Sequence, residues 1–442
     1  MSGAHLDTFQ AQAVVEARLG RAPQDMLEAA VVLEAWVGIP AGKALESGRR
    51  IMKTNRGRRR PSTGALHRTP AVKGIALEGL AFIASMIAIA CWAAPLSNAL
   101  GVETVKEALL IALPLTIALQ WGVNSRYLSR PRGTVYLGKH PLMLALLSGG
   151  LIVVLAAIFG QSGLIAGLFA VMWTGGTILI TSRLPDEYVG LVLLATTGIY
   201  AGLSPVAVLA GAAAITTVIV IIAVTMTVNK DEPTHQPGRW SRVGMASAIG
   251  LGIGALLVVD RTVDWSLGVV PALGLLPSTI ASFWGGSYLW RFQDVLQSAA
   301  AGIPVSSGTV RGTSRVPLAL LVGALTRLVL VTIVLSAILV FGAQLLNVRT
   351  SGTTVLVGFG LVALATLLVG MLEAVGRGPW ALSALMIAVV TELAVSSTLD
   401  ADIAPGLGLI AGSGMVVALT LPMVAFVLSR PATTLATRLR VT

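Results

Sequence analysis

The chain has 442 residues, of which 55% are hydrophobic and 12% are charged, and its formal net charge is +11. A water-soluble protein of this length needs more charged side chains to cover its surface, so the composition excludes a soluble globular protein. The positive charge would suit nucleic acid, but basic residues also collect in the cytoplasmic loops of membrane proteins, so we expect no nucleic-acid partner.

The first 70 residues are polar and differ from the rest of the chain. Helical spacing of apolar residues predicts short helices over 7–19, 25–37 and 41–52, followed by a basic linker over 53–60. The linker suits the anionic lipid headgroups of the cytoplasmic leaflet. The helices could dock a cytoplasmic glycosyltransferase or another assembly partner, or they could form an accessory tail lying on the core.

From residue 74 onward, apolar runs recur at the length of about 20 residues that a helix needs to cross a bilayer. We therefore expect an all-α polytopic membrane protein with about twelve transmembrane helices, of which the fifth is short. The predicted spans are 74–96, 105–124, 141–160, 163–182, 188–203, 205–228, 243–260, 266–289, 317–345, 353–375, 379–398 and 405–428.

The distribution of Lys and Arg predicts the orientation of these spans. With the N-terminus in the cytoplasm, only Lys106, Arg261 and Arg349 fall in outer segments, and Arg327 falls within a span. Basic residues favour the cytoplasmic side, so both termini are predicted to be cytoplasmic, in a bacterial inner (plasma) membrane.

Two spans carry a sequence repeat. Residues 113–122 read LPLTIALQWG and residues 276–285 read LPSTIASFWG, with seven of ten positions identical. Chance similarity between apolar segments is the alternative, but Trp and Pro are uncommon enough to favour a true repeat.

The repeat lies in the second and eighth spans, so its offset is six helices. An even offset gives two parallel six-helix halves related by an axis along the membrane normal. We place the first half at 71–230 and the second at 231–442, after a cytoplasmic segment at 1–70. Pro114 and Pro277 occupy equivalent mid-span positions, where each is a hinge or a static bend.

This layout resembles the multidrug/oligosaccharidyl-lipid/polysaccharide (MOP) exporter superfamily. The resemblance rests on the helix count, the parallel repeat, the long basic loops after the second and eighth spans, and Trp173 followed by Arg183 and Tyr188. Within the superfamily, the sequence is most similar to polysaccharide flippases and to the membrane subunit of Pel-type exopolysaccharide export. The loop 125–133, SRYLSRPRG, lacks the acidic residue of the corresponding loop in the major facilitator family.

The resemblance implies flippase-like export of a lipid-linked or nascent polysaccharide by alternating access. The alternatives are an ion-coupled small-molecule exporter and a non-transporting membrane scaffold or assembly subunit. The four histidines lie far apart in the sequence and no Walker A lysine is present, so we expect no enzyme activity, no cofactor and no metal site.

Ionisable residues inside spans are costly in lipid and are therefore candidate functional residues. Arg327 could bind a substrate phosphate in a cavity, or pair structurally with Glu373. Further candidates for substrate binding at the cavity mouth are Arg126, Arg183 and Arg291, which could instead merely follow the positive-inside rule. The candidate ion-coupling carboxylates are Glu392, Glu373 and Glu78, the last of which could snorkel to water.

Overall fold

The computed structural model describes most of the chain. The described residues are 8–19, 23, 26–55, 72–128, 141–181, 184–227, 240–260, 263, 274–280, 284, 315–345, 350–398 and 405–429. Within these residues the regular structure is helical, which confirms the predicted all-α class.

The N-terminal segment forms three helices with a core of their own. They are α1 (Thr8–Leu19), α2 (Met26–Val37) and α3 (Ala41–Asn55), which match the predicted helices, although α3 runs three residues further. Val15, Leu33 and Ile51 are fully buried between them. Gly48 of α3 lies against the backbone of α2, where a side chain would collide with the carbonyl of Met26. These three helices, here called the N-terminal unit, contact α12.

The next group contains five helices. They are α4 (Val72–Leu100), α5 (Val102–Leu128), α6 (Pro141–Thr181), α7 (Pro185–Tyr200) and α8 (Pro205–Thr227). Helix α6 contains both the third and the fourth predicted spans, so these five helices correspond to the first six predicted spans. Their bounds agree with those spans to within a few residues.

The fold reverses within α6 at Gly160, whose φ of 60° and ψ of −131° are not helical. A residue with a Cβ is strained in this backbone conformation, so the sequence needs glycine there. Beyond the reversal, Gly163 lies against the carbonyl of Leu155, and a methyl group at Gly167 would meet the Cα of Ile152 at 2.9 Å. The two arms of α6 are therefore antiparallel and tightly packed, as expected for two successive spans.

The last group begins with α9 (Trp240–Val258) and continues through the helical stretch 274–280. It ends with α12 (Arg315–Leu345), α13 (Thr350–Ala374), α14 (Gly378–Thr398) and α15 (Leu407–Ser429). Of the predicted eighth span, 266–289, most residues lie outside the described part of the chain. The other predicted spans of this group match α9 and α12 to α15.

Eight helices in the described residues are long and apolar enough to cross a membrane. They cover Gly79–Leu100, Ala145–Ile180, Pro205–Ala223, Ser241–Val258, Leu325–Leu345, Thr353–Ala374, Gly378–Thr398 and Leu407–Val427. Large apolar side chains stay exposed along several of them, including Leu146 at 73% and Val390 at 62%. Such contiguous exposed apolar surface suits contact with lipid.

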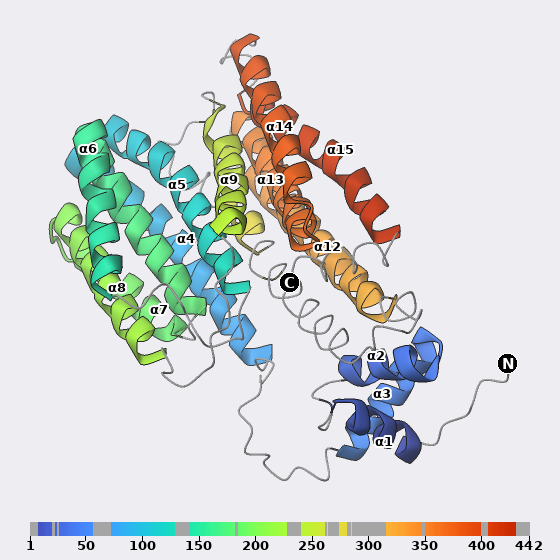
Figure 1. The fold of residues 1–442 in the computed structure, drawn as a ribbon. Coiled ribbons are helices and arrows are strands. Elements are labelled where there is room, and N and C mark those ends of the chain that lie inside the picture. The colour runs from blue at the N-terminus through green and yellow to red at the C-terminus, as the bar shows by residue number, and fades with distance from the viewer. Residues whose placement is uncertain are drawn as a thin grey trace.

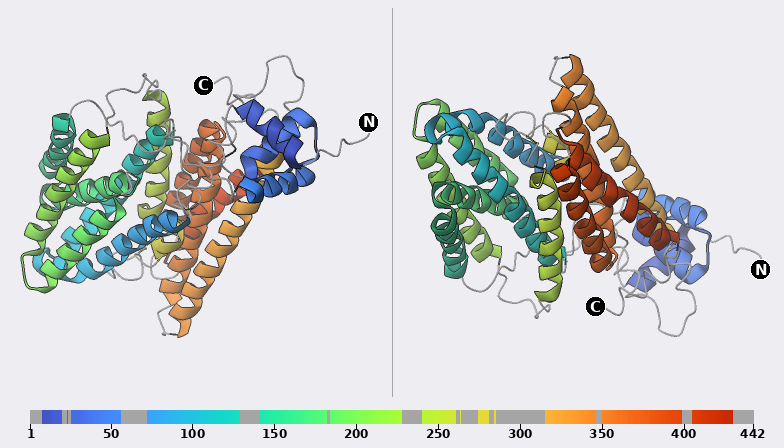
Figure 2. Two further views of the ribbon diagram at one scale, coloured as in Figure 1. Left: turned by 90° about the horizontal axis from the view of Figure 1, so that it is seen from below. Right: turned by 90° about the horizontal axis from the view of Figure 1, so that it is seen from above.

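The helices gather into two groups that meet at α5 and α9. Figure 1 shows α4 to α8 on one side and α12 to α15 on the other, with α9 between them. The views in Figure 2 show the same separation from below and from above. The N-terminal unit lies beside the lower end of α12 in Figure 1.

Candidate functional site

The two helix groups are joined along α5 and α9 by a seam of small residues. A methyl group at Gly250 of α9 would lie 2.7 Å from the carbonyl oxygen of Ile117 and 2.9 Å from the Cβ of Trp121. One turn further, a methyl group at Gly254 would lie 2.8 Å from the Cβ of Pro114. Such contacts are possible only because glycine lets the two backbones approach closely. The predicted hinge residue Pro114 thus lies in the contact between the groups.

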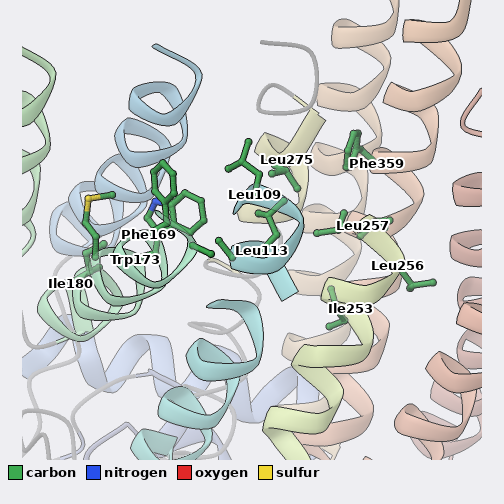
Figure 3. Close-up of a cluster of buried hydrophobic side chains, with 14 of the residues drawn as sticks. Leu109, Leu113, Phe169, Trp173, Ile180, Ile253, Leu256, Leu257, Leu275 and Phe359 are labelled. Carbon is green, nitrogen blue, oxygen red and sulfur yellow. The ribbon is translucent and has the colours of Figure 1, made fainter. Parts of the chain in front are cut away.

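Apolar side chains continue the seam away from the glycines. Figure 3 shows Leu109 and Leu113 of α5 turned toward Ile253 and Leu257 of α9. All four are buried in one hydrophobic cluster that also includes residues of α13 to α15. The seam is therefore a continuous apolar contact between the two groups.

The two repeat tryptophans each contact a glycine in the first helix of the opposite predicted half. Trp121 of α5 lies against Gly250 of α9, while the ring of Trp284 would meet a methyl group at Gly79 of α4 at 2.7 Å. The predicted two-fold relation between the halves would exchange these two contacts, and that relation stays a prediction. Pro277 is buried in the stretch 274–280, and its predicted role as a hinge stays a prediction.

A pair of buried carboxylates lies where α9, α14 and α15 meet. Glu392 of α14 is 0% exposed, and Asp260, two residues after the end of α9, is 1% exposed. The two groups are close enough to interact electrostatically. The predicted candidate Glu392 is thus buried among the helices, with Asp260 as its neighbour, while its ion-coupling role stays a prediction.

A glycine stripe on α15 makes room for both carboxylates. A methyl group at Gly408 would lie 2.8 Å from Oδ2 of Asp260, and one at Gly412 would lie 2.7 Å from Oε2 of Glu392. Residues four apart in a helix share a face, so both acids pack against the same side of the first two turns of α15. The backbone amide of Leu409 donates a hydrogen bond of 2.9 Å to Asp260 Oδ2, which caps the start of α15.

Glu392 differs from Asp260 in its hydrogen bonding. Both carboxylate oxygens of Glu392 are buried, and among the described residues neither makes a hydrogen bond of ordinary geometry. An ionised carboxylate without a partner in such surroundings costs several kcal/mol, about the penalty for a buried ion. A proton or a bound cation would remove that cost. Chemically, the pair is a site that can take up and release H⁺ or a small cation.

Arg327 of α12 is exposed. Ser336 of the same helix faces α13, because a methyl group at Gly360 would lie 2.8 Å from its Oγ. Nine residues separate Arg327 from Ser336, which is two and a half helical turns, so Arg327 points directly away from α13. Glu373 of α13 is half-buried, and the described residues include no salt bridge between it and Arg327. The alternative of a structural Arg327–Glu373 pair is therefore not seen.

The other predicted site residues have side chains outside the described part of the structure. Glu78 and Arg126 belong to α4 and α5, but their side chains lie outside the described part of the structure, as do Arg183 and Arg291 altogether.

Asp260 is the functional candidate that the sequence analysis missed. It was counted as the last residue of the seventh span and followed by Arg261, so it resembled an ordinary helix end. Its signal is weak, because the residues it meets lie more than 130 positions further along the chain.

Polar contacts also join α4 and α7. Tyr188 and Ser85 share a hydrogen bond of 2.9 Å, and Trp92 Nε1 donates to Thr196 Oγ1 at 2.9 Å. Each of these side chains bonds to a partner on the other helix of the pair, so the bonds stabilise the packing of α4 on α7 within the group α4 to α8.

Comparison with solved structures gives transporters of low sequence identity. A MOP-superfamily transporter from Pyrococcus furiosus is 12% identical, with a TM-score of 0.45 over 81% of this chain and 96% of that one. A MATE in the bent conformation is 14% identical, with a TM-score of 0.43 over 82% of this chain and 94% of that one. An outward-facing multidrug resistance MATE family transporter is 13% identical, with a TM-score of 0.37 over 100% of both chains.

No protein-family model and no curated protein matches the sequence. Two of these solved structures, the one from Pyrococcus furiosus and the outward-facing one, are described as transporters of the MOP superfamily.

Proposed function

We propose that this protein is a membrane transporter that exports small molecules by alternating access, driven by exchange for H⁺ or Na⁺. It would lie in a bacterial inner membrane with both termini in the cytoplasm, as the distribution of basic residues predicts. The observation that carries the proposal is the buried pair Asp260 and Glu392, whose second member makes no hydrogen bond of ordinary geometry among the described residues.

The pair suits ion coupling because its charge can change inside the protein. With both groups ionised, two like charges repel each other in a medium of low polarity. Uptake of H⁺ or Na⁺ removes this repulsion and lets α14 and α15 pack closely. Loss of the ion restores the repulsion between the two carboxylates and favours separation of α14 from α15. An ion that binds one arrangement better than another shifts the balance between them.

Helix α9 connects this pair to the seam between the two helix groups. Asp260 follows its last turn, while Gly250 and Gly254 on the same helix hold α5. A shift of α9 against α14 and α15 therefore also moves one side of the contact with α5. Rigid-body movement of one group against the other is the usual way in which paired halves alternate access.

We favour the small-molecule alternative over the polysaccharide flippase because the buried charged residues among those described are acids. The flippase prediction relied on arginines facing a cavity. Arg327 points away from α13, and the side chains of Arg126, Arg183 and Arg291 lie outside the described residues. Carboxylates and aromatic side chains occupy buried positions, as with Glu392 and the stacked pair Phe169 and Trp173, whose ring centroids are 5.0 Å apart.

The test uses purified full-length protein in liposomes that carry an imposed pH or Na⁺ gradient. Ethidium serves as the small-molecule probe, and a lipid-linked oligosaccharide serves as the flippase probe. The variants are Glu392→Gln and Asp260→Asn, which remove charge at nearly constant volume. Asparagine keeps an oxygen that accepts the Leu409 amide, so the second variant preserves the cap of α15.

The proposal expects gradient-driven ethidium movement that both variants abolish. Glu103→Gln is the matched control, because Glu103 is an acid at the start of α5 with a side chain 79% exposed, and it should transport as the wild type does. Movement of the oligosaccharide alone would replace the proposal with the flippase. Movement of neither probe under any gradient would favour the scaffold alternative.

A further inference from the structure

The outward face of α12 is apolar apart from one arginine near its predicted cytoplasmic end. Leu330, Val334 and Ile338 are 56%, 55% and 60% exposed and share the face of Arg327. A guanidinium surrounded by lipid-facing apolar side chains costs about 2.5–3.5 kcal/mol at mid-membrane unless it reaches a polar partner. Arg327 therefore needs a polar group to contact at the membrane.

The length of α12 places Arg327 at a membrane boundary. Helix α12 has 31 residues, or about 46 Å, which exceeds the roughly 30 Å of a hydrocarbon core. The stretch from Arg327 to the exposed Leu345 spans about 27 Å, close to the whole core thickness. With Leu345 at the outer boundary, the Cα of Arg327 lies about 3 Å inside the inner edge of the core, from which a long arginine side chain can extend to the phosphates of the inner leaflet.

The N-terminal unit brings further positive charge to the same end of α12. Helices α2 and α3 contact α12, and Figure 1 places them at its lower end. Lys43 and Arg49 of α3 are exposed, while Arg50 is held by Glu46 at 2.6 Å. Helix α3, which contacts α12, thus carries two exposed cations.

We propose that Arg327, with the exposed cations of α3, binds the phosphate of an anionic phospholipid from the cytoplasmic leaflet on the outward face of α12. Arginine suits this role because its planar guanidinium donates two parallel hydrogen bonds to a phosphate. The acyl chains of the same lipid would lie along Leu330, Val334 and Ile338. The site faces the bilayer, so its natural occupant is a resident lipid and it does not rest on the proposed transport activity.

The open space around Gly323 fits a ligand on this face. Gly323 lies four residues before Arg327, and a methyl group placed there would meet nothing within 4 Å. The helix surface beside the guanidinium is therefore not covered by the described parts of the protein. Among the described residues, no packed side chain would have to move for a lipid headgroup to reach Arg327.

The experiment measures lipid binding to full-length detergent-purified protein by native mass spectrometry. Phosphatidylglycerol and phosphatidylcholine with identical acyl chains are titrated, so that only the headgroup charge differs. The variants are Arg327→Gln and Arg327→Lys. Lys106→Gln is the matched control, because it removes one positive charge at the opposite end of the bundle, where Lys106 lies 3.9 Å from Glu103.

We expect Arg327→Gln to weaken phosphatidylglycerol binding about fivefold, with a smaller loss for Arg327→Lys and none for Lys106→Gln. Phosphatidylcholine should bind all four proteins equally. Replacing Lys43 and Arg49 by Gln together should weaken phosphatidylglycerol binding further in the Arg327→Gln background.

Two results would overturn the inference. One is equal phosphatidylglycerol binding by Arg327→Gln and Lys106→Gln, which would show that Arg327 only reaches water. The other is selective binding of a polyprenyl phosphate that phosphatidylglycerol cannot displace, which would make the site one for a lipid-linked substrate. Arg327→Lys keeps the charge, so it retains the test if Arg327→Gln fails to fold.

Discussion

Replacement of Gly254 by Ala tests whether α5 and α9 are packed as tightly as the structure indicates. The added methyl group would lie 2.8 Å from the Cβ of Pro114, 3.2 Å from its backbone nitrogen and closer still to its Cα. Carbon atoms in contact normally stay about 3.5–4.0 Å apart. Backbone and ring atoms cannot rotate out of the way, so the two helices must separate.

The size of the effect follows from two opposing terms. Overpacking costs about 1–3 kcal/mol, while exchanging a helical glycine for alanine favours the helix by about 1 kcal/mol. Gly244→Ala supplies a control on the same helix, because Gly244 is exposed and a methyl group there meets nothing within 4 Å. The control shows the helix-propensity gain alone, so the difference between the two variants is the overpacking cost of about 1–3 kcal/mol.

Thermal unfolding in a single detergent, followed by tryptophan fluorescence, measures this difference. We expect Gly254→Ala to unfold several degrees below Gly244→Ala, at about 2–4 °C per kcal/mol for a large domain. If the two variants unfold at the same temperature, the methyl group at Gly254 meets no neighbour, and the close approach of α5 to α9 is wrong.

Three further variants test separate contacts. Tyr188→Phe keeps the buried ring but removes the hydrogen bond to Ser85, and should lower the stability by about 1 kcal/mol in the same unfolding assay. Gly160→Ala forces a Cβ into the reversal of α6 and should cost about 1–3 kcal/mol, whereas Gly150→Ala, in open space on the same helix, should not destabilise. Asp260→Asn should preserve thermal stability better than Asp260→Ala, because only asparagine can still accept the amide at the start of α15; equal losses would show that the cap is unimportant.

Most of the helices could be predicted from the sequence because the bilayer imposes their length. Apolar runs of about 20 residues and the alternation of basic loops are properties of single segments. The reversal at Gly160 was also predictable as a boundary between two spans. The extension of α4 to Leu100 was not, because Pro95 resembles a helix end but is accommodated inside the helix.

The candidate site could be predicted only in part, because it is built from distant segments. Glu392 was predictable as an acid within an apolar run, and its burial agrees with that. The position of Arg327 within its span was equally visible, but the face of α12 that it occupies depends on where α13 packs. Asp260 was missed because its importance comes from Leu409 and Glu392, which only the folded chain brings near it.

The arrangement of α9 explains why a charge change at Asp260 would have an effect beyond its immediate neighbours. One end of this helix meets α14 and α15 at two carboxylates, and its middle meets α5 through Gly250 and Gly254. Packed helices move as rigid bodies, because small residues leave no flexible side chains to absorb a displacement. A change in repulsion between the carboxylates must therefore be relieved at α14 and α15 or transmitted along α9 to the seam. Gly408 and Gly412 lie where the first movement would occur, and Gly250 and Gly254 lie at the contact through which the second would reach α5.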